Sequence, residues 1–156
     1  MSRRLTRTIW PTLKSQSFWI ALIAAILFLV LSSVRLTEQG LYYDELHQAT
    51  ASFAYLGKPV SASFYVLGYP VLNMPYSGAV KSAIYGIYLR LFDARFTVYS
   101  WRLLGLIFAA AGILLLGVVA GQGLRPTLAV IFLTFLLSDV SVLLMSRHDW
   151  GPVALA

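Results

Sequence analysis

Two adjacent carboxylates, Asp44 and Glu45, stand in the segment GLYYDELHQATASFAYLGK, residues 40–58, shortly after a long apolar run ends. A carboxylate at a membrane surface can act as a general base, and this is the chemistry that the pair predicts for Asp44. The alternative is structural. At the start of a helix over 45–56, Asp44 would accept backbone N–H bonds and meet the positive end of the helix dipole. A reciprocal capping box would then need Glu or Gln at position 47, where this chain has His47.

A second polar group, Ser146-Arg147-His148-Asp149-Trp150, directly follows the last apolar run. Arg147 and Trp150 are typical of anchors at the level of the lipid headgroups. Asp149 does not fit that interpretation, because anionic headgroups would repel it. If both acidic sites lie on one side of a membrane, Asp44 and Asp149 are expected to converge on one cavity.

Four basic residues mark the boundaries of the apolar segments: Lys81, Arg90, Arg95 and Arg102. One interpretation is that each extends its charged end to the headgroups. The other is that Arg102 binds a phosphate through two parallel N–H groups. Asp139 lies inside the last apolar run, where a carboxylate is either functional or paired, and Arg102 is its candidate partner.

The composition defines the setting for these residues. The chain is 59% hydrophobic and 12% charged, with a mean hydropathy of +0.77, which is typical of an integral membrane protein. Its net charge of +6 comes from basic residues that flank apolar runs singly or in pairs, so no nucleic-acid-binding stripe is expected. There is no cysteine, which excludes disulfides and thiolate metal sites.

We expect an all-α integral membrane fold. A helix rises about 1.5 Å per residue, so a hydrocarbon core of roughly 30 Å needs about 20 apolar residues. Three segments come close to this length, at 18–34, 103–121 and 127–145. The shorter apolar stretch 82–89 cannot cross, and it predicts an interfacial helix over 78–92.

The long loop between the first two spans is expected to carry one more amphipathic helix, over 42–56. Its apolar stripe consists of Tyr42, Leu46, Ala49, Phe53 and Leu56. Asp44 falls on the opposite face, away from lipid, and Glu45 falls at the boundary. The stretch 57–77 is rich in Gly, Pro, Ser and Asn, and we expect an ordered loop there.

The amino terminus sets the predicted topology. It carries four basic residues and no acidic one before the first span, which places residues 1–17 in the cytoplasm of a multi-pass plasma (inner) membrane protein. An uncleaved span fits 18–34 better than a signal peptide, whose apolar region is shorter and ends in small residues. Residues 35–102 and those from 146 onward are then outside. If 78–92 crossed the membrane, every later side would be reversed.

The order of these motifs resembles the amino-terminal part of the GT-C superfamily of membrane glycosyltransferases. The closest branch contains protein O-mannosyltransferases, lipid A aminoarabinose transferases and bacterial polyprenyl-phosphate-sugar transferases. The matching segments are Asp44-Glu45, Met74-Pro-Tyr-Ser-Gly-Ala-Val-Lys81, Trp101-Arg102-Leu103-Leu104-Gly105 and Ser146-Arg147-His148-Asp149. Some relatives have Lys-Pro-Pro where this chain has Asn73-Met-Pro75.

The resemblance implies an inverting transferase that moves a sugar from a polyprenyl-phosphate donor to an acceptor glycan, lipid or protein at the outer face. It implies Asp44 as the base, with Glu45 and Asp149 orienting donor or acceptor. Arg102, Lys81 and Arg147 would stabilise the donor phosphate. The branch need not use a metal, and the resemblance implies no other cofactor besides the lipid-linked sugar donor as substrate. A divalent metal held by the two histidines and the carboxylates is an open alternative.

Family members run to several hundred residues, so we expect 1–156 to be one amino-terminal portion of such a domain, inactive by itself. Two other classes stay open. A transporter subunit would place Asp139 and the acidic loop on an ion path, although two of the three predicted spans have no ionisable residue in their interior. A non-catalytic membrane scaffold is the other.

Overall fold

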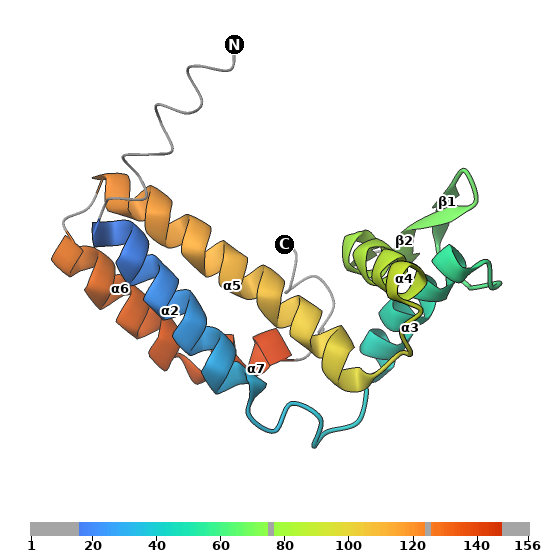
Figure 1. Cartoon of the computed structure of the whole chain (residues 1–156), viewed down its shortest axis with the longest axis horizontal. Helices are drawn as coiled ribbons and strands as arrows, with labels where there is room; N and C mark the ends of the chain where they lie inside the picture. The colour runs from blue at the N-terminus through green and yellow to red at the C-terminus, as the bar shows by residue number, and fades with distance from the viewer. Residues whose placement is uncertain (1–15, 75–76, 124–125, 148–156) are drawn as a thin grey trace, which may run out of the picture.

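The computed structural model describes residues 16–74, 77–123 and 126–147. Most of these residues are helical, and they form two parts. A bundle of long helices makes one part, and a smaller unit of short helices and a sheet lies beside one end of the bundle (Figure 1). The fold is therefore mostly helical, as predicted, but it is not all-α.

Helices α2 (Gln16–Ser33) and α5 (Val98–Gly123) lie side by side in the bundle (Figure 1). Both have segments long and apolar enough to cross a membrane. These are the 18 residues of α2, with a mean hydropathy of 2.1, and the 22 residues Val98–Val119, with 2.4. The helices predicted at 18–34 and 103–121 are confirmed. The second begins earlier than expected, so Arg102 lies within its first turns.

Small side chains allow α2 and α5 to approach closely. Ala21, Ala24 and Ala25 are buried in the shared core with Ala110. A Cβ atom added at Gly117 would lie 2.5 Å from the Cβ of Ala21. Helices in lipid associate largely through such close packing of small residues, because burial of apolar surface gives little advantage there.

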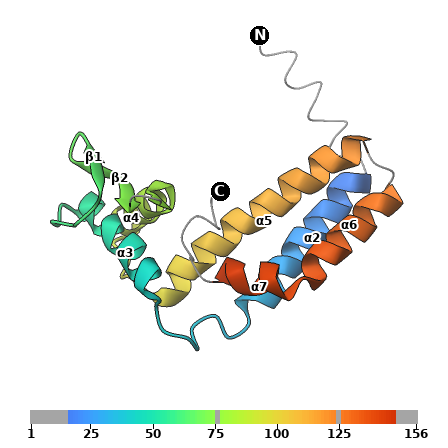
Figure 2. The ribbon, with the colours of Figure 1, turned by 180° about the vertical axis from the view of Figure 1, so that it is seen from behind.

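The third predicted span, 127–145, is not one helix. Helix α6 (Pro126–Ser138) ends before Asp139, and α7 (Val140–Arg147) follows at an angle to it (Figure 2). The Oδ1 atom of Asp139 accepts a hydrogen bond of 2.7 Å from the backbone N–H of Ser141. This local bond competes with the helical ladder and starts a new helix. Helix α6 rises only about 20 Å, less than a hydrocarbon core.

The smaller unit begins with α3 (Tyr43–Ala51) and the 3₁₀ helix η1 (Ser52–Leu56). The helix predicted over 42–56 is confirmed in extent, but its predicted apolar stripe is buried only in part. Ala49 of the stripe is buried, whereas Leu46 is 53% exposed. The buried side also includes the polar residues Glu45, Gln48 and Ser52. The polar side can be buried because its groups find partners inside the protein.

The predicted loop at 57–77 contains a small antiparallel sheet in the order β1-β2-β3, with strands β1 (Phe64–Val66), β2 (Tyr69–Met74) and β3 (Ser77–Gly78). Leu67 and Gly68 form the turn between the first two strands, with φ angles of 51° and 83°. Positive φ at both positions matches the right-handed twist of a hairpin. A leucine at the first of them gave no signal of such a turn.

Helix α4 (Val80–Phe92) confirms the helix predicted over 78–92. With 13 residues it rises about 20 Å, too little to cross a membrane. One side is buried against α3, η1 and α5 and includes Lys81, Ser82, Tyr85 and Leu89. The opposite side exposes a row of large apolar side chains, Val80, Ile84, Ile87 and Leu91.

Candidate functional site

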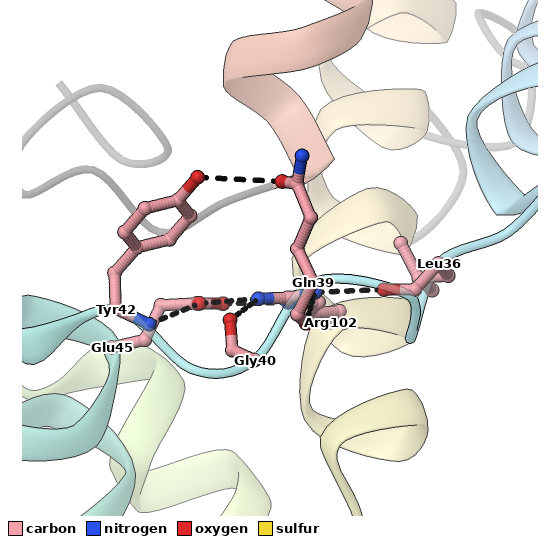
Figure 3. A network of polar contacts seen from close by, with 6 residues as sticks. All are labelled: Leu36, Gln39, Gly40, Tyr42, Glu45 and Arg102. Atoms are coloured by element: carbon pink, nitrogen blue, oxygen red, sulfur yellow. Dashed lines mark hydrogen bonds and ion pairs between the residues drawn. The ribbon is translucent and has the colours of Figure 1, made fainter.

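A buried ion pair joins α3 to the first turns of α5. Arg102 donates from Nε to Glu45 Oε1 at 2.9 Å and from Nη2 to Glu45 Oε2 at 2.7 Å (Figure 3). The two side chains are 1% and 0% exposed. Parallel N–H···O bonds between a guanidinium and a carboxylate are among the strongest and most directional polar contacts in proteins. The ion pair therefore fixes the start of α3 to the amino-terminal end of α5, which is long and apolar enough to cross a membrane.

The remaining donors of Arg102 bind backbone carbonyls of the segment between α2 and α3. Nη1 donates to the carbonyls of Leu36 and Gln39, at 2.8 and 2.9 Å, and Nη2 donates to that of Gly40 at 2.8 Å (Figure 3). A guanidinium has five N–H donors, and these bonds with those to Glu45 use all five. A phosphate would reach Arg102 only by displacing one of these partners.

Glu45 also starts its own helix. Its Oε2 atom accepts a bond of 3.1 Å from the backbone N–H of Tyr42, the residue at the N-cap position (Figure 3). The interpretation of Asp44 as the cap is therefore wrong, because the helix begins two residues earlier, with Tyr42 at the N-cap position. Asp44 lies in the first turn, where its charge still complements the helix dipole. It is half-buried and directly precedes Glu45 in the sequence.

Lys81 lies in the interior of the smaller unit and is 2% exposed. Its Nζ atom is 4.0 Å from the centroid of the Trp101 ring. A desolvated ammonium over an indole face is a favourable cation–π contact. The Nε1 atom of Trp101 is itself buried and has no hydrogen-bond partner among the described residues.

A chain of polar contacts links β2, α4 and α3 next to Lys81. Asn73 Nδ2 donates to Ser82 Oγ at 2.6 Å, and Ser82 Oγ donates to the carbonyl of Gln48 at 2.7 Å. Within the described ranges, Asn73 Oδ1 and Gln48 Nε2 are buried without a partner. Buried polar atoms without a hydrogen-bond partner are unusual in proteins. Their presence beside Lys81 makes this polar interior a candidate binding site.

Arg147 lies at the end of α7 and reaches back to the end of α2. Its Nη2 atom donates to the carbonyls of Val34 and Arg35, at 2.6 and 2.9 Å. Its Nε atom is buried and, in the part of the chain that the structure describes, unpaired. Asp149, the predicted companion of Asp44, lies outside the described residues.

The structure thus joins some of the predicted site residues and separates others. Glu45 and Arg102 are in contact, and Arg102 and Arg147 bind carbonyls of the same segment, residues 34–40. The pairing of Asp139 with Arg102 is wrong, because Asp139 is exposed and caps α7. Trp101 was not assigned a role from the sequence. Its place directly before Arg102 was the available signal.

Among the described residues, no group of three or more His, Asp or Glu side chains is placed to hold a metal ion. His148 and Asp149, two of the proposed ligands, fall beyond the described ranges. The metal site stays a prediction.

Comparisons of this chain with protein-family models, with curated proteins and with solved structures found no match. The resemblance to the GT-C superfamily therefore rests only on the motifs quoted in the sequence analysis, and it stays a prediction.

Proposed function

We propose that this chain belongs to a membrane glycosyltransferase that moves a sugar from a polyprenyl-phosphate donor to an acceptor at the outer face of the membrane. One observation carries the proposal. Asp44 stands in the first helical turn beside Glu45, whose carboxylate is locked to Arg102 at the end of a span-length helix. A carboxylate on a turn that is held rigidly at the end of such a helix supports a role as a general base at a membrane surface.

The proposed reaction requires one base. Asp44 takes the proton of an acceptor hydroxyl or amine while that oxygen or nitrogen attacks the anomeric carbon of the sugar. The bond from this carbon to the phosphate oxygen breaks, and polyprenyl phosphate leaves with the electron pair. Attack opposite the leaving group inverts the anomeric centre. Because a phosphate leaves readily, no paired acid is needed.

Glu45 and Arg102 act as positioning residues in this proposal, since their contacts with one another, with Tyr42 and with three carbonyls hold the turn that carries Asp44. The donor phosphate is assigned to Arg147 and Lys81. Arg147 supports this with its Nε atom, and Lys81 with the neighbouring Nε1 atom of Trp101. Both atoms are buried and have no hydrogen-bond partner among the residues that the structure describes. Asp149 is proposed to orient donor or acceptor.

The proposed setting is a plasma (inner) membrane with the amino terminus in the cytoplasm. Helices α2 and α5 have the length and composition to cross it. Helix α4 would lie on the outer surface with its exposed apolar row toward lipid, as the row Val80, Ile84, Ile87 and Leu91 favours.

Replacing Asp44 by Asn tests the proposal. Transfer from a polyprenyl-phosphate sugar, assayed with the full-length protein in membranes, should fall by about 10²–10⁴-fold, the contribution of a general base. The matched control is Glu38→Gln, which removes an exposed carboxylate from the same outer loop, and it should keep full activity. Unchanged turnover in the Asp44 variant would exclude Asp44 as the base, whereas a wild type without transfer would favour a non-catalytic role.

A further inference from the structure

A cavity of about 460 Å³ lies on the smaller unit, apart from the Glu45–Arg102 pair. It is bounded by the end of η1, the start of β2 and the end of α4. The lining residues are Ala54, Tyr55, Leu56, Gly57, Tyr69, Leu89, Arg90 and Asp93. Its volume falls within the range of about 300–1,000 Å³ that is typical of small-ligand sites.

One wall of this cavity is aromatic. The rings of Tyr55 and Tyr69 are stacked, with centroids 5.0 Å apart and planes 27° from parallel. Gly86 makes room for this wall. A Cβ atom at this position would lie 2.5 Å from the carbonyl oxygen of Ser52 and 2.7 Å from Cδ2 of Tyr55. Burial raises the pKa of the Tyr55 phenol, and the nearby Tyr69 raises it further, so the Tyr55 hydroxyl stays protonated and able to donate near neutral pH.

The other wall carries opposite charges that do not pair. Arg90 and Asp93 both line the cavity, yet no ion pair within 4.0 Å joins either of them to another described residue. Asp93 ends α4 in a left-handed conformation with a φ of 46°, which turns the chain at the cavity rim. An unpaired guanidinium and an unpaired carboxylate offer strong donors and acceptors to the same ligand.

From this arrangement we propose that the cavity binds a saccharide. The apolar face of a sugar ring packs against the tyrosine wall, and its hydroxyls both donate to Asp93 and accept from Arg90. Other ligand classes fit less well. An anion would be repelled by Asp93, and a cation would be repelled by Arg90. An apolar chain would remove water from both charged groups without offering them hydrogen bonds. A neutral molecule rich in hydroxyl groups can donate to Asp93, accept from Arg90 and pack against the tyrosine rings.

In a transferase this site would hold the acceptor glycan, and that role rests on the proposed function. Saccharide binding itself does not, because it requires no turnover. The two proposals therefore fail separately. Asp44 can be the base in a protein whose cavity binds no sugar, and the cavity can bind sugar in a protein without transferase activity.

The experiment measures binding of the methyl glycosides of glucose, galactose and mannose by saturation-transfer NMR, using the full protein in lipid nanodiscs. At least one glycoside should bind to the wild type. Arg90→Gln and Asp93→Asn should each weaken that binding by about tenfold or more, as expected when a bond to a charged group is lost. Asn tolerates the left-handed conformation at position 93, so the end of α4 is preserved.

Arg95→Gln is the matched control. Arg95 is exposed just beyond the same helix and does not line the cavity, so its loss should leave the affinity unchanged. The absence of binding to all three glycosides in the wild type overturns the proposal. Equal affinity in the wild type, Arg90→Gln and Asp93→Asn also overturns it, because the sugar would then be bound elsewhere.

Discussion

Glu45 places a full negative charge in the protein interior, where an uncompensated carboxylate costs several kcal/mol. Arg102 compensates it, and the fit between the two groups is complete: two bonds to Glu45 and three to backbone carbonyls satisfy the guanidinium. Such a pair is valuable chiefly for the geometry that it fixes. Here that geometry is the first turn of α3, and with it Asp44.

Glu45→Gln should destabilise the protein by about 3–5 kcal/mol, because Arg102 would remain buried without its counter-charge. Thermal unfolding in detergent measures the change. The exposed pair Arg35–Glu38, with side chains 74% and 58% exposed, provides the control, and Glu38→Gln should change stability by less than about 1 kcal/mol. Equal effects of the two substitutions would contradict the structural role of the buried pair.

The sequence pointed to Asp44, Glu45 and Arg102 but not to the contact between two of them. Glu45 and Arg102 are 57 residues apart, and nothing in the local pattern of either segment specifies the other. Arg102 was predicted as a phosphate ligand because a boundary arginine is also a good anion binder. Tertiary structure decides between a carboxylate and a phosphate as its partner, and a pattern of residue types does not contain that choice.

At the scale of elements, the contact between α2 and α5 depends on glycine and alanine residues, whose small size lets the two helices approach closely. Gly117→Ala should weaken the bundle by about 1–3 kcal/mol, since the added methyl group would lie 2.5 Å from Ala21. Gly112 lies on the same helix with nothing within 4 Å of an added Cβ. Gly112→Ala should therefore be neutral or stabilise the helix by up to about 1 kcal/mol.

Thermal unfolding of the two alanine variants, compared with the wild type, checks this pair of predictions. A Gly117 variant as stable as the Gly112 variant would mean that α2 and α5 pack differently from the arrangement in Figure 1.

Hydropathy was sufficient to predict the long elements, and turn chemistry was not. Helices α2, α4 and α5 follow from uninterrupted or amphipathic apolar runs. The division of 127–145 follows from one hydrogen bond of Asp139, which a hydropathy window averages away. The sheet within 57–77 depends on a Leu67-Gly68 turn, and leucine is not a residue that indicates positive φ.

At the scale of the whole molecule, the proposed topology can be tested by cysteine labelling. The chain has no cysteine, so single cysteines can be introduced without background labelling. Ser61→Cys should react with an impermeant thiol reagent added to intact cells, because the smaller unit is proposed to lie outside. Gln122→Cys, at the opposite end of α5, should react only after the membrane is permeabilised.

The reversed pattern, with Gln122→Cys labelled in intact cells and Ser61→Cys protected, would contradict the proposed orientation. Labelling at both positions in intact cells would contradict α5 as a span. The reversed pattern would also move Asp44 and the saccharide cavity to the side opposite the proposed one.

The hydrogen bonds from Arg102 and Arg147 to the segment between α2 and α3 have an evolutionary consequence. Both arginines hold this segment through main-chain oxygens, which every amino acid supplies. Residues such as Gln39 and Gly40 can therefore drift among homologues while the anchor persists. The two arginines and Glu45 have no such freedom. Related chains are expected to show a variable linker between invariant charges, and this pattern would identify distant members more reliably than the linker's own sequence.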